Sequence, residues 1–149
     1  MEDVNAYKNM SKADKDKMIA EFKYMQELYS NEYRSIINRI NDNTEHLNML
    51  YTAQESIENA DIIKDKEILS FVGESIFIPS KIINNDKFIV GVGSAFFVEV
   101  DAENTKRIIS KYINKANNEL KKLNNNKKEI EAALFDMSFQ MNKLNVLTS

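Results

Sequence analysis

The chain has 149 residues, of which 43% are apolar and 29% are charged, a balance typical of a folded protein. Its net charge of −3 disfavours a nucleic-acid partner, because contacts to phosphates need a surplus of Lys and Arg on one face. The absence of Cys excludes disulfides, cysteine-ligated metals and a thiol nucleophile.

The N-terminal residues MEDVNAYKNM are polar and acidic, without the basic and apolar regions of a signal peptide. The longest uncharged apolar run, residues 88–98, is about half of the roughly 20 residues that a membrane span needs. We therefore expect a soluble, cytoplasmic protein without a membrane partner.

A first long helix is predicted over residues 12–62. Ser11 supplies a hydroxyl for an unpaired backbone N–H, and Asp14 follows three residues later, which is a helix-start pattern. From Met18 to Ile57, apolar residues recur at alternating spacings of four and three, with one extra step of four. This pattern is a heptad repeat with a stutter, typical of a coiled coil.

The region 67–100 is predicted to form two β-hairpins. Its short runs of Ile, Val and Phe are separated by turn residues, and every Gly and the single Pro of the chain fall between residues 73 and 93. Pro79 has no N–H to donate to a ladder, so its strand should lie at an edge or be bulged there. The four strands are expected at residues 67–72, 75–82, 87–92 and 95–100.

Two hairpins have no internal layer to pack on, and their edges would be exposed. We therefore expect other chains to cover them, in a sheet or barrel shared between subunits. The residues expected to carry this assembly are Phe71, Phe77, Ile78, Phe88, Val90, Val92, Phe96, Phe97 and Val98.

A second long helix is predicted over residues 102–147, with Asp101 as its N-cap. Its apolar seam (Thr105, Ile109, Tyr112, Ala116, Leu120, Leu123, Lys127, Ile130, Leu134, Met137, Met141, Leu144) has the same alternation of four and three. Two helices of matching length around a short connector predict an antiparallel coiled coil. Facing positions should then sum to about 165, which places Ile57 near Ile108 and Met18 near Leu147.

This register brings Asn43 close to residues 124–127, and a polar layer across the coiled coil is predicted there. Either the layer is an accident of an Asn-rich chain, or its polar groups fix the register while they weaken the arm locally.

The order helix, two hairpins, helix resembles an alpha-type prefoldin subunit over nearly the whole chain. The segments SIFIPSKI (75–82) and FIVGVGSAFFVE (88–99) resemble the hairpin signature of that family. Ser80 stands where the family has Gly, and the Gly expected near Ala95 is absent, so one turn should differ in detail. The expected fold class is α+β: one subunit spanning 1–149, a long antiparallel two-helix coiled coil joined by two β-hairpins that contribute to an intersubunit β-barrel.

Within the family, the segments EFKYMQE (21–27) and EVDAENT (99–105) are most similar to eukaryotic subunit three, a von Hippel-Lindau binding protein, whereas IPSK (78–81) is closer to subunit five or to archaeal alpha chains. The resemblance implies a hetero-hexamer with beta-type subunits and a second alpha-type subunit. It also implies capture of nonnative actin and tubulin without ATP, and their delivery to the cytosolic group II chaperonin.

The free end of the coiled coil is the expected client-binding tip, because flexible Met side chains gather there and aromatic residues leave the seam. The alternative is that these side chains pack against a neighbouring arm or are simply exposed. The residues of the expected tip are Met18, Phe22, Tyr24, Met25, Phe135, Met137, Phe139, Met141 and Leu144.

We expect neither an enzyme nor a cofactor or metal site. His46 is the only His and lies off the seam, and Gly91 and Gly93 lack the third glycine of a nucleotide-binding motif. The alternative function is a structural coiled-coil adaptor in a prefoldin-like scaffold complex, although a tether has no need of barrel-forming hairpins.

Overall fold

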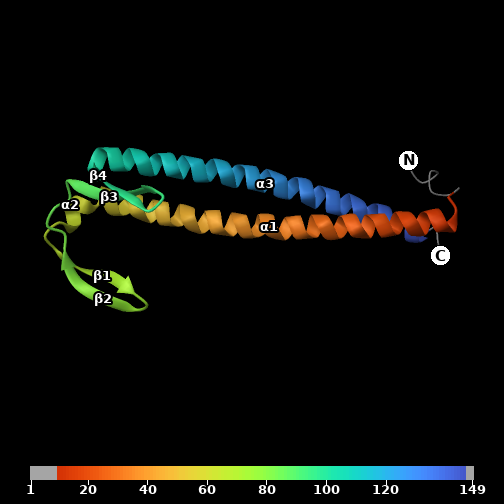
Figure 1. Cartoon of the computed structure of the whole chain (residues 1–149), viewed down its shortest axis with the longest axis horizontal. Coiled ribbons are helices and arrows are strands. Elements are labelled where there is room, and N and C mark those ends of the chain that lie inside the picture. The colour runs from red at the N-terminus through yellow and green to blue at the C-terminus, as the bar shows by residue number, and fades with distance from the viewer. Residues whose placement is uncertain (1–9, 147–149) are drawn as a thin grey trace. The chain divides into compact units, whose positions relative to one another are not determined.

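The computed structural model describes residues 10–146, and its elements follow the predicted order of helix, two hairpins and helix (Figure 1). The elements are α1 (Lys12–Glu58), α2 (Ala60–Ile63), β1 (Glu67–Gly73), β2 (Ile76–Lys81), β3 (Lys87–Gly93), β4 (Phe96–Asp101) and α3 (Ala102–Val146). The chain divides into two compact units. The arm unit combines α1 up to residue 43 with α3 from residue 119, and the hairpin unit comprises residues 44–118.

Helix α1 begins where the sequence predicts. The Asp14 backbone N–H donates to Ser11 Oγ at 3.2 Å, and the Ser11 hydroxyl donates to Asp14 Oδ2 at 2.6 Å. The helix was expected to continue to residue 62, but it ends at Glu58. Asn59 then separates it from the single turn of α2.

The two helices of the arm unit are antiparallel and pack through the predicted seams. Gln26 Nε2 donates to Ser138 Oγ at 3.2 Å, and the Tyr33 hydroxyl donates to Glu131 Oε1 at 3.0 Å. Both pairs sum to 164, which confirms the predicted register for this unit to within one residue. The residues of the arm core are Ile36, Leu123 and Ile130, with Tyr29, Tyr33, Ile40 and Leu134 packed against them.

The predicted polar layer is not formed by Asn124, Asn125 and Asn126. The side chains at positions 124–126 are exposed, and Asn124 Nδ2 donates to the Leu120 carbonyl oxygen of its own helix at 2.9 Å. An Asn can satisfy its amide in this way without a partner on the other helix, so a run of Asn next to the seam does not make a layer. The buried position in this stretch is Leu123, with 2% of its surface exposed.

The seam of α3 also differs from the prediction near its start. Ile109, Ile113 and Ala116 are buried, whereas Tyr112 is 39% exposed. The seam therefore steps by four from Ile109 and passes through Ile113. At the other end, Leu147, which was expected opposite Met18, lies outside the described residues.

The hairpins form two separate antiparallel two-stranded sheets, β1–β2 and β3–β4. The first pairs Glu67 with Lys81 at its open end, and the second pairs Lys87 with Asp101. Each ladder has an irregularity just before its turn, and every Cα pair of the second equals a pair of the first shifted by 20 positions. Pro79 pairs with Leu69 in a strand that has only one neighbour, which is the predicted edge position.

The two turns differ as the missing glycine suggests. Glu74 follows Gly73 with φ of 50°, whereas both residues after Gly93 are left-handed, Ser94 at 49° and Ala95 at 60°. An Ala side chain in this region is strained, because its Cβ approaches the following carbonyl oxygen.

Candidate functional site

One face of the β1–β2 hairpin is an uncovered apolar surface. The cross-strand pairs Phe71–Phe77 and Leu69–Pro79 lie on this face, since directly paired residues share a side of a sheet. Leu69, Phe71 and Phe77 are 68%, 63% and 53% exposed. The two Phe rings meet edge to face at 5.5 Å between centroids and otherwise leave the face open. This face is therefore a contiguous exposed apolar surface of the kind found at interaction sites.

The opposite face of the same hairpin is also open. Ile78 pairs with Ser70, and both Ile76 and Ile78 are exposed. Within the part of the chain that the structure describes, neither face of this two-stranded sheet is covered by a second layer. A two-stranded sheet of this kind is marginally stable alone.

The β3–β4 hairpin has two unlike faces. Phe88 and Val90 are half-buried, and they pair with Val100 and Val98. On the other face, Phe97 lies opposite Gly91 and is 69% exposed. A Cβ at Gly91 would sit 3.4 Å from the Phe97 ring, so the ring lies over the space that the glycine leaves.

Of the residues predicted to carry assembly, two are half-buried, Phe88 and Val90. The exposed members are Phe71, Phe77, Ile78, Val92, Phe96, Phe97 and Val98. Sequence reasoning missed Leu69, Ile76 and Ile89, which are 60–68% exposed on the same hairpins. Strand alternation could have found two of them, because side chains two residues apart on a strand share a face. Leu69 lies two residues before Phe71, and Ile89 lies two residues before Gly91, which pairs with Phe97.

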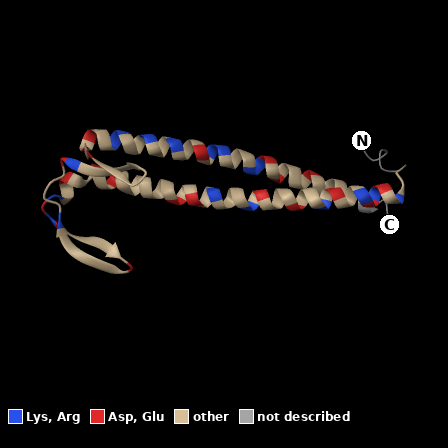
Figure 2. Cartoon of the chain, viewed as in Figure 1, with Lys and Arg blue, Asp and Glu red and all other residues tan. Residues whose placement is uncertain are grey.

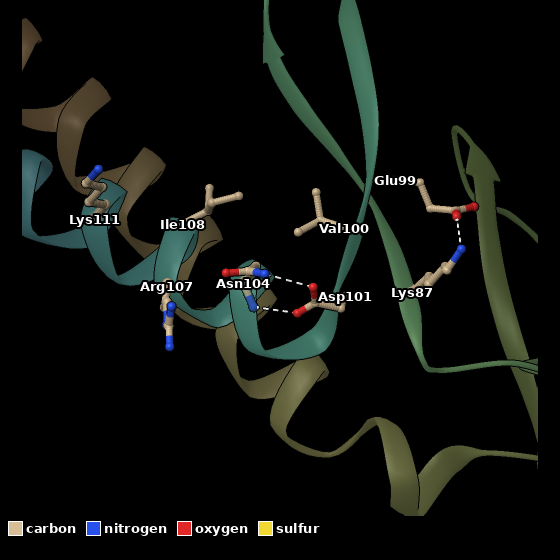
Figure 3. Close-up of a pocket in the computed structure, with 8 residues that line it drawn as sticks. All are labelled: Lys87, Glu99, Val100, Asp101, Asn104, Arg107, Ile108 and Lys111. Carbon is tan, nitrogen blue, oxygen red and sulfur yellow. Dashed lines mark hydrogen bonds and ion pairs between the residues drawn. The ribbon is translucent and has the colours of Figure 1, made fainter.

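A charged cleft lies where the base of the β3–β4 hairpin meets the start of α3 (Figure 3). Lys87 Nζ pairs with Glu99 Oε1 at 2.5 Å, and this carboxylate raises the pKa of Lys87 by a hydrogen bond and by charge attraction. The Asp101 carboxylate accepts the Asn104 backbone N–H and the Asn104 side-chain amide, each at 2.8 Å. These two bonds, the backbone one first, lower the pKa of Asp101. The prediction that Asp101 caps the second helix is confirmed.

The loop between the hairpins is anchored to α2. Asn85 is buried, with 8% of its surface exposed, and its side-chain amide donates to the Asp61 carboxylate. The Asp65 N–H adds a backbone bond to the Ile82 carbonyl oxygen at 3.0 Å. These bonds fix the connection from which both hairpins leave.

The predicted tip residues of the arm unit differ in exposure. Tyr24, Phe135 and Phe139 are 63%, 76% and 50% exposed, and Met25 is 39% exposed. The Lys143 ammonium lies 4.4 Å above the Phe139 ring, a cation–π contact. Of the other predicted tip residues, Met18, Phe22, Met137 and Met141 are half-buried, and Leu144 has no exposed surface. Leu144 is therefore a packing residue in the described chain, and the most exposed of the predicted tip residues are aromatic.

Acidic and His side chains do not gather into a metal-binding group in residues 10–146. No set of three or more His, Cys, Asp or Glu side chains there could hold a metal ion. Figure 2 shows Lys, Arg, Asp and Glu distributed along both long helices, with few on the hairpins. None of the described helices is both long enough and apolar enough to cross a membrane.

The comparisons with known proteins agree with this layout. A comparison with curated proteins gives no match. Among solved structures, the chain is similar to the filamentous PFD of Methanocaldococcus jannaschii, determined by cryo-EM, with a TM-score of 0.65 and 19% identity over 76% of this chain and 95% of that chain. This likeness supports the fold. The family model described as "Prefoldin subunit" matches residues 22–146, and the chain therefore belongs to the prefoldin family.

Proposed function

We propose that the chain is an alpha-type prefoldin subunit whose hairpins complete a β-barrel shared with beta-type subunits and a second alpha-type subunit. The observation that carries this proposal is the pair of two-stranded sheets with exposed apolar faces, Phe71 and Phe77 on one and Phe97 on the other. Burial of a Phe side chain contributes about 1.5–3 kcal/mol, so covering three of them is a substantial driving force for assembly.

The strand edges supply the second part of the argument. Each strand pairs with only one neighbour in the described chain, so every strand retains a row of unpaired backbone N–H and C=O groups. Strands from neighbouring subunits would satisfy these groups and cover the apolar faces together. Closure into a barrel removes the edges altogether.

The arm tip is proposed to hold nonnative polypeptides, actin and tubulin among them, for delivery to the cytosolic group II chaperonin without ATP. Tyr24, Phe135 and Phe139 support this role, because they are exposed and lie outside the seam that joins the helices. A coiled coil does not need large apolar groups at such positions. The finer placement as subunit three or subunit five in the cytoplasm rests on the sequence resemblance.

Purification of the native complex, with its subunits identified by mass spectrometry and its size by chromatography, tests the assembly role. The expected result is a hexamer that contains other prefoldin subunits. A well-dispersed, stable monomer in light scattering would contradict the proposal, because the isolated chain should associate through its uncovered strands.

The tip is tested by changing Tyr24, Phe135 and Phe139 together to Ser. Each aromatic contributes on the order of 1–2 kcal/mol of client contact by area, so suppression of denatured-actin aggregation should weaken at least about tenfold. The hexamer should still form, since these residues are not on the hairpins. Lys121→Ser with Lys128→Ser, at exposed positions of the same helix, is the matched control. Equal protection of actin by the triple variant would favour the alternative role, a structural adaptor in a prefoldin-like complex.

A further inference from the structure

The cleft beside β4 combines an apolar floor with charged walls. Its lining comes from the base of the β3–β4 hairpin and the first three turns of α3, and its volume is about 690 Å³. Val100 and Ile108 are half-buried in it. Figure 3 shows these two side chains between Lys111 at one end and the Lys87–Glu99 pair at the other.

One lining charge stands apart because it has no partner. Lys87 pairs with Glu99, and Arg107 Nη2 pairs with Glu103 Oε1 at 2.6 Å. The Lys111 side chain makes no ion pair or hydrogen bond with any residue in 10–146. Residues 101–118 carry four cations and two acids, and these acids are bonded elsewhere, Asp101 to Asn104 and Glu103 to Arg107, so neither pairs with Lys111. The cleft therefore offers an unmatched positive charge next to an apolar surface.

The neighbouring strand adds backbone groups to this arrangement. β4 pairs only with β3 in the described chain, so its other edge has no strand partner, and the Val100 carbonyl oxygen of β4 accepts the Thr105 hydroxyl at 3.4 Å. An extended polypeptide can bond to such an edge with its main chain, and its alternate side chains then reach the adjoining pocket. The lining acids Glu99 and Asp101, with Glu103 close by, would repel the dense charge of nucleic acid or polyphosphate. An isolated carboxylate with an apolar neighbour fits better.

We propose that this cleft binds an acidic segment of a neighbouring subunit, with a carboxylate on Lys111 and an apolar side chain over Val100 and Ile108. The choice of a subunit as the partner rests on the proposed function, because the cleft is continuous with the strand edge proposed for assembly. The contact adds an electrostatic element to the barrel interface, and it favours partner subunits that carry this acidic and apolar pattern.

A carbodiimide, which joins an amine to a carboxylate only when the two are in contact, tests the proposal in the intact complex. Mass spectrometry should find Lys111 linked to an Asp or Glu of another subunit. Lys111→Arg keeps the charge and removes the reactive amine, so the complex should persist without this link. An intact hexamer in which Lys111 forms no link to another subunit would overturn the proposal.

Charge reversal supplies a second measurement. Lys111→Glu should increase the rate of subunit exchange at least threefold, with the difference from the parent shrinking as salt is raised. Lys106→Glu makes the same change on the same helix outside the cleft lining, and it should leave the rate within about 1.5-fold of the parent. Equal acceleration by both variants would overturn the proposal, since it would show a diffuse effect of net charge.

Size-exclusion chromatography distinguishes a failure of assembly from a failure of the cleft to bind. If no complex forms, the proposed function fails first, and the cleft is tested on the sparsely immobilised full-length chain with a peptide that carries one Glu and one Leu two residues apart, so that both lie on the same face of an added strand. Binding that is weakened at least threefold by Lys111→Glu and unaffected by Lys106→Glu supports the site. No binding at about 1 mM, or tighter binding of a single-stranded oligonucleotide, overturns it.

Discussion

The arm unit buries its apolar seam, whereas the hairpins expose theirs. In the arm, Leu123 and Ile130 are 2% and 5% exposed, so the chain buries its own seam. On the hairpins, Phe96 and Phe97 are about 70% exposed. A helix satisfies its backbone internally and needs one apolar stripe covered, which the second helix provides. A two-stranded sheet has two faces and two edges to cover, and one chain of this layout leaves them open.

The largest expected effect comes from breaking the hairpin surface. Phe97→Asp places a charge where partner strands should pack, so co-purification of other subunits should be abolished, with helical circular dichroism nearly unchanged. Ser94→Asp introduces the same charge in the turn of the same hairpin, at a left-handed position that Asp tolerates, and should still assemble. Retained assembly of Phe97→Asp would show that the strands are not the interface.

The converse change breaks the arm. Leu123→Ala removes a buried side chain from the arm core and should cost about 2–5 kcal/mol of unfolding free energy, measured by urea denaturation at 222 nm. Assembly at low temperature should survive, since the hairpins are untouched. Lys121→Ala, two residues away and exposed, should stay within about 0.5 kcal/mol of the parent. A loss below about 1 kcal/mol for Leu123→Ala would mean that the seam is not the main source of stability.

A change from Ala to Gly should affect stability in opposite directions in the two units. Ala95→Gly relieves a left-handed Ala at φ of 60° and should stabilise by about 0.5–1 kcal/mol. Ala132→Gly, at an exposed position inside α3, should destabilise by about 1 kcal/mol. Thermal unfolding of both variants measures the difference. Destabilisation by Ala95→Gly would indicate that this turn is not strained.

The smallest expected effect concerns Asp101, which caps the N-terminus of α3 directly after β4. The pKa of Asp101 is lowered by its bonds to Asn104, so its stabilisation is present above the ordinary carboxyl range and lost as pH falls through the lowered value. Asp101→Asn keeps an acceptor but does not titrate there. The parent should melt about 2 °C higher at pH 7, and this difference should shrink as the pH falls below the ordinary carboxyl range. Asp136→Asn, an exposed position on the same helix, controls for loss of charge, and a pH-independent difference at Asp101 would contradict the cap argument.

The helices and strands could be predicted because their signals are local. Ser11, Asp14 and Asp101 mark helix starts by side-chain bonds to nearby backbone groups, and these bonds are present. Runs of Ile, Val and Phe between turn residues located both hairpins, and the matching lengths of the two heptad seams gave the arm register. These features depend on neighbours within a few residues or on a simple repeat.

The features that were not predicted depend on which of several available groups a side chain bonds to or packs against. Asn124 bonds to its own helix and not across the coil, and Asn85 is buried because Asp61, far away in sequence, accepts its amide. The buried position near the start of α3 is Ile113 and not Tyr112, because the helix departs there from the regular heptad spacing that the prediction assumed. The cleft also escaped, since it joins residues of a hairpin and a helix that no sequence repeat relates.

The local pairing of the hairpins has a consequence for the order in which the chain matures. The paired ends of each hairpin are 14 residues apart, whereas Gln26 and Ser138 of the arm are separated by 112. Hairpins form in about 1–10 μs, while the 45 residues of α3 take about 2–9 s to be synthesised at roughly 5–20 residues per second. A nascent chain therefore exposes its apolar strands seconds before α3 is complete and can pair with α1. If the proposed partner subunits cover these strands, those present at the ribosome would have the first opportunity to do so, and a chain made in excess of its partners would be expected to aggregate.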